Sequence, residues 1–178
     1  MNKATLVIAA MSAVSISTLS HASQICASQL VPNTTPTEQF VVKEDGTVCD
    51  KQTNLMWQRC TFGQVYNSDS GSCDNVAQEL SWQQALQTAN AQEFAGYSDW
   101  HLPNVKELAS IVEHSCVKPS INETVFLATL DKNYWSSTTV EGAPSNAWLL
   151  SFGDGKVSNV FNKSAQAYVR LVRYTFCE

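Results

Sequence analysis

DWHLPNVKEL, residues 99–108, places an extended segment, a turn and a helix start within ten residues. Pro103 fixes its own φ angle and biases Leu102 toward an extended backbone, so the chain arrives at this point extended. Asn104 can then cap a helix, because Glu107 stands three residues later and its carboxylate can accept from the backbone N–H of the cap. The stretch therefore predicts where a helix begins.

The residues behind this cap continue the helical pattern. Polar residues lie between apolar ones that recur at helical spacing from residue 105 to residue 112. The apolar stripe consists of Val105, Leu108, Ala109, Ile111 and Val112. We therefore expect a helix over residues 105–112 with one buried side. The pattern is architectural and indicates no particular chemistry.

A second helix is expected to begin after Ser81. This serine is a suitable cap, and Gln84 occupies the position that completes a capping box. Apolar side chains then recur on one side of the expected helix, which stops near Asn90: Trp82, Ala85, Leu86 and Ala89.

Short strands are expected on both sides of the two helices. Before them, residues 40–42 and 47–49 form a hairpin around Asp45-Gly46, and residues 55–57 follow. After them, the expected strands are 134–138, 147–152, 156–160 and 168–174, with a hairpin turn at 153–155. Because strands and helices come in separate runs rather than alternating, the order indicates an α+β fold with an antiparallel sheet.

The N-terminus has the pattern of a secretory signal peptide. A short positive region precedes a mostly apolar run, and small residues end at Ala22, where we expect cleavage. The apolar run is shorter than the roughly 20 residues of a membrane-spanning helix, and no later stretch is long enough, so we expect no membrane insertion. The expected organisation is a signal peptide at 1–22, an extended N-terminal arm at 23–39 and one domain at 40–178, in a periplasmic or secreted protein.

All six cysteines lie after the expected cleavage site, which predicts disulfide bonds in an exported chain. Zinc is the rival explanation, but the sequence has no C-x-x-C pair and its two later histidines are not spaced as in a zinc finger, so we expect no metal and no cofactor. Cys60 and Cys73 enclose a polar surface loop, and their bond would contribute ~3 kcal/mol by restricting the unfolded chain. For the others we favour Cys26 with Cys116 and Cys49 with Cys177.

Several stretches together resemble the Lcl C-terminal domain, a family long described as of unknown function. They are TNLMWQRC at 53–60, SWQQA at 81–85, GYSDWHLPNVKEL at 96–108, YWSS at 134–137, AW at 147–148 and VRLVR at 169–173. The resemblance covers about residues 40–173 in the right order. It implies a C-type-lectin-like fold, related to formylglycine-generating enzymes and to variable receptor-binding proteins, in which a twisted antiparallel sheet is flanked by two helices.

Two further expectations follow from the resemblance. The terminal strands meet in that fold, which favours the bond between Cys49 and Cys177 and a domain stapled by disulfides. His101 stands where the family usually has Arg, so an ion pair made by that Arg would here be lost or depend on pH. Family members differ in their partners, and the resemblance therefore implies a fold rather than a ligand.

The sequence offers little support for catalysis. It contains no G-x-S-x-G, no H-E-x-x-H and no glycine-rich phosphate loop. His101 or His114 could act as a base with Asp99, but a lone histidine beside a helix start is usually a packing residue. The formylglycine-generating relatives use two cysteines near the C-terminus, where this chain has only Cys177. We expect that the protein is not an enzyme.

Calcium-dependent sugar binding would need several oxygen ligands around one ion. Glu141, Asn146 and Asp154 lie in the appropriate part of the chain, but the Glu-Pro-Asn and Trp-Asn-Asp motifs of calcium-binding lectins are absent. Aromatic stacking on a sugar is another possibility that the five tryptophans raise. Their positions in expected strands and on an apolar helix side predict core packing for at least four of them.

The remaining functional hypothesis is that the protein binds a ligand through loops on a rigid scaffold. The loop 139–146 and the segment 159–166 are polar and correspond to the ligand-binding side of lectin-like relatives, although they could equally be solvated turns. The candidate ligand-binding residues are Thr139, Glu141, Asn146, Lys156, Asn159, Asn162, Lys163 and Gln166. The leading hypothesis is an exported, non-catalytic recognition module for a glycan or a protein. The alternative is a periplasmic inhibitor or immunity-type protein that blocks an envelope-acting enzyme.

Charge is unevenly distributed along the chain. Residues 23–154 carry 6 Lys and Arg against 15 Asp and Glu, whereas residues 155–177 carry 4 cations and no anion. A polyanion such as nucleic acid should be repelled overall, and an acidic glycan would be attracted only if the late cations share one side. Strand alternation puts Arg170 and Arg173 on opposite sides, so at most one of them would join Lys156 and Lys163.

Overall fold

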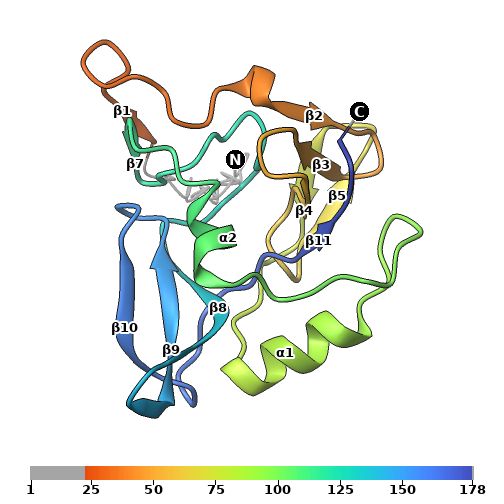
Figure 1. The fold of residues 1–178 in the computed structure, drawn as a ribbon. Coiled ribbons are helices and arrows are strands. Elements are labelled where there is room, and N and C mark those ends of the chain that lie inside the picture. The colour runs from red at the N-terminus through yellow and green to blue at the C-terminus, as the bar shows by residue number, and fades with distance from the viewer. Residues whose placement is uncertain (1–22, 178) are drawn as a thin grey trace, which may run out of the picture.

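The computed structural model describes residues 23–177, and the expected signal peptide at 1–22 lies outside the described residues. Two antiparallel sheets carry most of the architecture, and two short helices pack beside them (Figure 1). The protein is therefore α+β and rich in sheet, as the segregated strand and helix runs predicted. Within residues 23–177, no helix is both long and apolar enough to cross a membrane.

The first sheet contains the strands from both ends of the domain. Its order is β11-β4-β3-β2, and all neighbours are antiparallel. The strands are β2 (Phe40–Val42), β3 (Thr47–Asp50), β4 (Leu55–Gln58) and β11 (Val172–Tyr174). The predicted hairpin turn between β2 and β3 is confirmed: Gly46 has a φ of 83°, and the Asp45 carboxylate accepts from the Thr47 backbone N–H at 2.9 Å.

The second sheet has the order β10-β9-β8. Its strands are β8 (Asn133–Val140), β9 (Ala143–Ser151) and β10 (Val157–Asn162). The expected loop at 139–146 is therefore wrong, because β8 and β9 continue through it and only Glu141 and Gly142 form the turn. Most residues at this end of the hairpin are exposed, so the strands need no alternation of apolar and polar residues there. Their polar sequence is therefore similar to that of a loop.

Smaller elements complete the fold. Two-stranded pairs are formed by β1 (Ile25–Cys26) with β7 (Cys116–Val117) and by β5 (Val65–Asn67) with β6 (Ser72–Asp74). A 3-10 helix, η1 (Thr37–Gln39), leads into β2. The pair β5–β6 occupies the segment between Cys60 and Cys73 that was expected to be a plain loop.

Both predicted helix starts are confirmed. The first helix, α1 (Trp82–Ala91), is capped by Ser81 with a complete capping box to Gln84. The second, α2 (Val105–Ala109), is capped by Asn104 with a complete capping box to Glu107. These reciprocal bonds satisfy backbone donors that a helix start leaves unpaired.

The second helix is shorter than expected, and its extension to residue 112 is wrong. The backbone N–H of Ser110 is shared between the carbonyls of Lys106 and Glu107, and the helix ends there. Val112 instead forms a β-bridge with Ile121. Ile111 and Val112 are both buried, so the apolar stripe correctly marked core residues but not the backbone that carries them.

The expected strand at 168–174 is also shorter in the structure. Only β11 is regular, because the segment before it changes partners along its length. Tyr168 bridges Tyr134 of β8, whereas the carbonyls of Val169 and Leu171 accept from Phe62 and Gln58. The segment 168–171 therefore carries the chain from the second sheet to the first.

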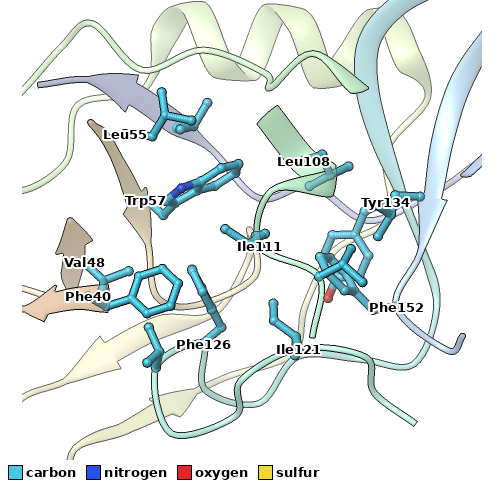
Figure 2. Close-up of a cluster of buried hydrophobic side chains, with 14 residues drawn as sticks. Phe40, Val48, Leu55, Trp57, Leu108, Ile111, Ile121, Phe126, Tyr134 and Phe152 are labelled. Atoms are coloured by element: carbon cyan, nitrogen blue, oxygen red, sulfur yellow. The ribbon is translucent and has the colours of Figure 1, made fainter. Parts of the chain in front are cut away.

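The core has two clusters of buried side chains. One surrounds Trp57 and Phe126, whose rings meet edge to face with centroids 6.4 Å apart (Figure 2). The other contains Trp100 and Trp135. The remaining tryptophans are less enclosed: Trp82 and Trp148 are only half-buried, so the expectation of at least four core tryptophans is wrong.

All three expected disulfides are present: Cys26–Cys116, Cys49–Cys177 and Cys60–Cys73. The first fastens the N-terminal arm, the second fastens the C-terminal segment to β3, and the third closes the loop that holds β5 and β6. No described cysteine is free. Such a set is typical of proteins that fold in an oxidising compartment.

Arg170 is fully buried on the segment that joins the two sheets. Its guanidinium donates to the carbonyls of Gln58 and Arg59 and to the Thr129 hydroxyl at 2.8 Å. Burial lowers the pKa of Arg170 to about 10, while the nearby Tyr134 opposes this shift, so the group stays charged at neutral pH. The charge is stabilised inside the protein by neutral acceptors rather than by a carboxylate.

Replacing Arg170 with Met is expected to destabilise the protein by about 3–5 kcal/mol, because several buried acceptors lose their donor at once. The matched control is Arg173→Met, three residues away. Arg173 binds Asp99, whose side chain is 58% exposed, and its loss should cost about 1 kcal/mol or less. Chemical denaturation of both variants measures the difference. Equal losses would contradict the role given to the buried guanidinium.

Glu113 anchors the N-terminal arm. Its carboxylate accepts from the backbone N–H groups of Thr34, Thr35 and Ser115 at 2.9–3.0 Å, and Glu113 is only 3% exposed. Burial raises the pKa of this carboxyl, but hydrogen bonds from Ser115 and from the arm outweigh it and lower the pKa to about 2. The arm is thus held by a carboxylate as well as by the Cys26–Cys116 bond.

Glu113 should make stability depend on acid. Because its folded pKa lies below the unfolded value of 4.5, the ionised carboxylate adds stability above pH 4.5 that disappears as pH falls toward 2. The shift corresponds to about 3 kcal/mol. Glu113→Gln should be less stable than wild type near neutral pH, and the difference should shrink in acid. A difference that does not change with pH in denaturation curves would refute this assignment.

Candidate functional site

Lys163 and Trp82 form the centre of a surface site between the second sheet and the start of α1. The Lys163 Nζ lies 3.8 Å from the centre of the Trp82 ring and donates to the Thr139 hydroxyl at 2.9 Å. The Trp82 indole N–H donates to the Ser136 carbonyl at 2.9 Å, which fixes the ring against β8. The site therefore presents a held aromatic ring beside an ammonium group.

Backbone hydrogen bonds join the three segments of this site. The Trp82 N–H donates to the Lys163 carbonyl at 3.1 Å, and the Lys163 N–H donates to the Ser145 carbonyl of β9 at 2.9 Å. The Asn162 side chain accepts from the backbone N–H of Ser164 at 3.0 Å and so shapes the turn after β10. The helix start, the hairpin and the turn are thus held in one arrangement.

A pocket of about 650 Å³ opens at this position. Its walls offer an aromatic ring, an ammonium group, hydroxyls and a carboxamide, from Ser81, Trp82, Gln83, Lys163 and Ser164. These groups suit binding of a hydroxylated or anionic molecule, because the ring can stack and the other groups can form hydrogen bonds.

Some predicted site residues come together here. Thr139 and Lys163 are in contact, and Asn162 lies beside them at the end of β10. Asn146 of β9 pairs with Asn162 in the sheet register, and its side-chain nitrogen is 3.5 Å from the Asn159 carbonyl, the outer limit of a hydrogen bond.

Other predicted site residues lie elsewhere. Glu141 is at the exposed tip of the β8–β9 hairpin, and Gln166 is exposed beyond the turn. Lys156 lies at the opposite end of β10 from Lys163 and pairs with Asp154 at 2.9 Å. Within residues 23–177, no hydrogen bond or ion pair joins the Lys163 ammonium to any of these three residues.

The cations of residues 155–177 do not form a shared basic patch on the surface. Arg170 is buried, so it cannot join a surface patch. Arg173 lies against the first sheet, where it pairs with Asp99 at 2.6 Å and covers the Tyr97 ring at 3.9 Å. The late cations are therefore separated, and Lys163 contributes a single charge to its pocket.

The family model of the Lcl C-terminal domain matches residues 46–173. The chain belongs to the Lcl C-terminal domain family. The match includes the second sheet, both helices, the Trp82–Lys163 pocket and most of the first sheet, whereas β2, the arm with Cys26 and the terminal Cys177 lie outside it. The comparison with curated proteins gave no match.

Trp82 is the site residue of this Lcl domain that its position in the sequence predicted to be in the core. Its helical spacing with Ala85 and Ala89 placed it on the buried side, and its ring does pack partly against the second cluster. What the spacing could not show is that the turn after β10 brings Lys163 over the ring. A bulky aromatic at the first position of a capped helix, where little chain covers it, was the only available signal.

A separate group of polar side chains in the Lcl domain surrounds His101. Its Nε2 lies 3.5 Å from a Glu107 oxygen, and its ring stacks on Tyr174 with centroids 4.9 Å apart. The Tyr174 hydroxyl donates to Glu107 at 2.7 Å. Burial raises the pKa of Glu107, but the nearby His101 and the hydrogen bonds from the Tyr174 hydroxyl and the Asn104 backbone N–H prevail and lower it. The imidazole thus takes a structural place beside the capping carboxylate.

Asp99 is unavailable as the partner of a catalytic histidine, because Arg173 binds both of its oxygens at 2.6 and 3.0 Å. The hydrogen bond from Arg173 lowers the pKa of Asp99. The oxygen groups considered for calcium are also dispersed: Glu141 and Asp154 belong to different hairpin turns. Among residues 23–177, no group of three or more His, Cys, Asp or Glu could hold a metal ion.

Lys163→Ala is expected to lower stability by no more than about 1 kcal/mol, because a cation–π contact at an exposed site contributes little. Lys156→Ala, at the other end of β10, is the matched control and should behave alike. Thermal or chemical denaturation provides the measurement. A loss of several kcal/mol only in Lys163→Ala would show that the ammonium is part of the framework rather than of a binding surface.

Proposed function

We propose that this Lcl domain is an exported, non-catalytic recognition module whose ligand is a glycan or a protein. The observation that carries the proposal is the Trp82–Lys163 pocket. Its aromatic ring is fixed by the bond from the indole N–H to Ser136, yet the residue is only half-buried and lines an open pocket. A fixed aromatic residue that is partly accessible provides contact area at low entropic cost.

The chemistry of the pocket supports binding rather than catalysis. Among the described residues, its lining contains no His, Cys, Asp or Glu, and Lys163, its one basic side chain, is held against the Trp82 ring and the Thr139 hydroxyl. The Ser81 hydroxyl accepts from the Gln84 backbone N–H in the helix cap. The groups that remain recognise a ligand by stacking and by hydrogen bonds.

The scaffold supports a C-type-lectin-like arrangement as part of the same proposal. The C-terminal β11 lies beside β4 in the first sheet, and Cys177 bonds to Cys49 of β3, so the C-terminal segment joins the sheet that the first strands of the domain form. The second sheet extends away from this base, and its β8–β9 turn lies at the same far end as the turn after β10 (Figure 1). Three disulfides fit export to the periplasm or the exterior, with residues 1–22 as the signal peptide.

Glycan-array screening of the mature domain, followed by titration of the strongest binder, tests the proposal. Trp82→Ala and Lys163→Ala are expected to weaken binding at least about tenfold, because a central aromatic and its charged neighbour are typical binding hot spots. Lys156→Ala should bind as wild type does. A ligand whose affinity falls with salt and with Lys163→Ala would be anionic, whereas a neutral ligand would depend mainly on Trp82.

Two outcomes would contradict the proposal. Binding that survives both substitutions would show that the pocket is not the site. Failure of every glycan, together with stoichiometric co-purification of one envelope-acting enzyme that the protein inhibits, would favour the alternative role of periplasmic inhibitor or immunity-type protein.

A further inference from the structure

Gln58, the last residue of β4, is held rigidly through its backbone. Its N–H donates to the Leu171 carbonyl at 3.1 Å, and its own carbonyl accepts from the buried Arg170 at 2.8 Å. The residue is only 7% exposed. Both backbone groups are thus committed to the segment that joins the two sheets, and the side chain starts from a fixed point.

The carboxamide of Gln58 is not used by the described part of the chain. Its Nε2 is shielded from solvent and has no hydrogen-bond partner among residues 23–177. A buried amide without a partner costs stability, since it loses its bonds to water and gains none. Such a cost is understandable when the group serves a ligand.

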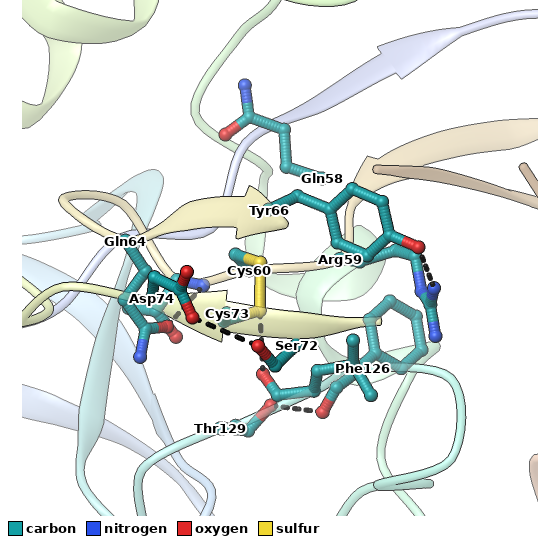
Figure 3. The surroundings of a disulfide bond; sticks show 12 residues. Gln58, Arg59, Cys60, Gln64, Tyr66, Ser72, Cys73, Asp74, Phe126 and Thr129 are labelled. Atoms are coloured by element: carbon teal, nitrogen blue, oxygen red, sulfur yellow. Dashed lines mark hydrogen bonds between the residues drawn. A yellow bond between two sulfur atoms is a disulfide. The ribbon is translucent and has the colours of Figure 1, made fainter. Parts of the chain in front are cut away.

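Gln58 lines a pocket of about 200 Å³ beside the Cys60–Cys73 disulfide. Figure 3 shows Gln58 and Tyr66 on the same side of this bond, with the carboxamide directed away from it. Three aromatic rings and three carboxamides contribute to the walls, and no lining residue is charged: Gln58, Cys60, Phe62, Gly63, Gln64, Val65, Tyr66, Gln92 and Phe94.

The walls of this pocket are held in place. The disulfide closes the loop, and a Cβ added to Gly63 would lie 2.6 Å from Gln78, so the loop backbone packs closely there. Gln64 accepts from the Thr61 N–H at 3.1 Å, and Gln92 donates to the Glu93 carbonyl at 3.1 Å. The pocket is therefore formed before any ligand arrives.

We propose that this pocket binds the acetamido group of an N-acetylated amino sugar. A primary carboxamide offers one donor and one acceptor side by side, and an acetamido group offers the complementary acceptor and donor. The acetyl methyl group then meets the rings of Phe62, Tyr66 and Phe94. An uncharged, largely apolar lining disfavours an ionised group, because no residue compensates its desolvation.

This site is independent of the Trp82–Lys163 pocket, since the two share no lining residue. The two pockets can therefore be tested separately, because substitutions in one should leave ligand binding in the other unchanged. The Gln58 pocket would also differ from the Trp82–Lys163 pocket in specificity, because acetylation of the sugar rather than its charge would determine the affinity.

Titration of methyl N-acetyl-β-glucosaminide into the mature domain, followed by NMR, tests the assignment. The Gln58 side-chain amide signals are expected to shift in wild-type protein, with an affinity in the millimolar range that suits one small group. Methyl β-glucoside and methyl β-glucosaminide, which lack the acetyl group, should produce no such shift.

Gln58→Leu should weaken binding of the acetylated sugar at least about tenfold, whereas the matched variant Gln83→Leu, in the other pocket, should bind normally. Because the amide nitrogen has no hydrogen-bond partner among residues 23–177, Gln58→Leu should also keep or raise the melting temperature. A marked drop in melting temperature would assign Gln58 a structural role. The NMR titration of the wild-type protein tests the proposal without any variant. The proposal is overturned if the Gln58 signals do not shift, or if the shifted signals cluster at Trp82.

Discussion

The buried guanidinium of Arg170 is the interaction on which the rest of the structure depends. It stays charged in the interior, and its two terminal nitrogens find acceptors in several segments of the chain. The acceptors come from the end of β4, from Thr61 and from Thr129, with the Phe126 ring 5.2 Å away. One side chain thus fixes where the crossing segment, the first sheet and the disulfide loop meet, and both candidate sites are built outward from that junction.

The two candidate sites differ in how the framework supports them. Gln58 belongs to the junction itself, because its carbonyl is one of the acceptors of Arg170. The Trp82–Lys163 pocket lies farther out, where a capped helix start meets the turn after β10. The first is rigid and uncharged, while the second carries one ammonium and an open mouth. Substitutions in the Trp82–Lys163 pocket should therefore disturb the core less than substitutions at the junction.

The ends of the chain are fastened by different chemistry. The C-terminal segment is fixed by Cys177 and by the pairing of β11 with β4. The arm has only two paired residues in β1, and it depends on the Cys26–Cys116 bond and on the Glu113 carboxylate. Covalent bonds and hydrogen bonds to a carboxylate replace the sheet pairing that such a short strand lacks.

The sequence by itself determined both capping boxes, the Asp45-Gly46 turn and the family, and it favoured the three cysteine pairs without determining them. Each depends on neighbouring residues or on a small set of possible partners. Only the tertiary structure decided the burial of Arg170, the end of α2 at Ala109 and the contact of Lys163 with Trp82. The alternation of side chains along a strand predicted that Arg170 and Arg173 lie on opposite sides, but it could not predict that the side with Arg170 faces the interior. The burial of Arg170 and the contact of Lys163 with Trp82 depend on segments 50 to over 100 residues apart meeting in space, and no local pattern encodes that. The end of α2 goes with the β-bridge between Val112 and Ile121, which the spacing of apolar residues does not show.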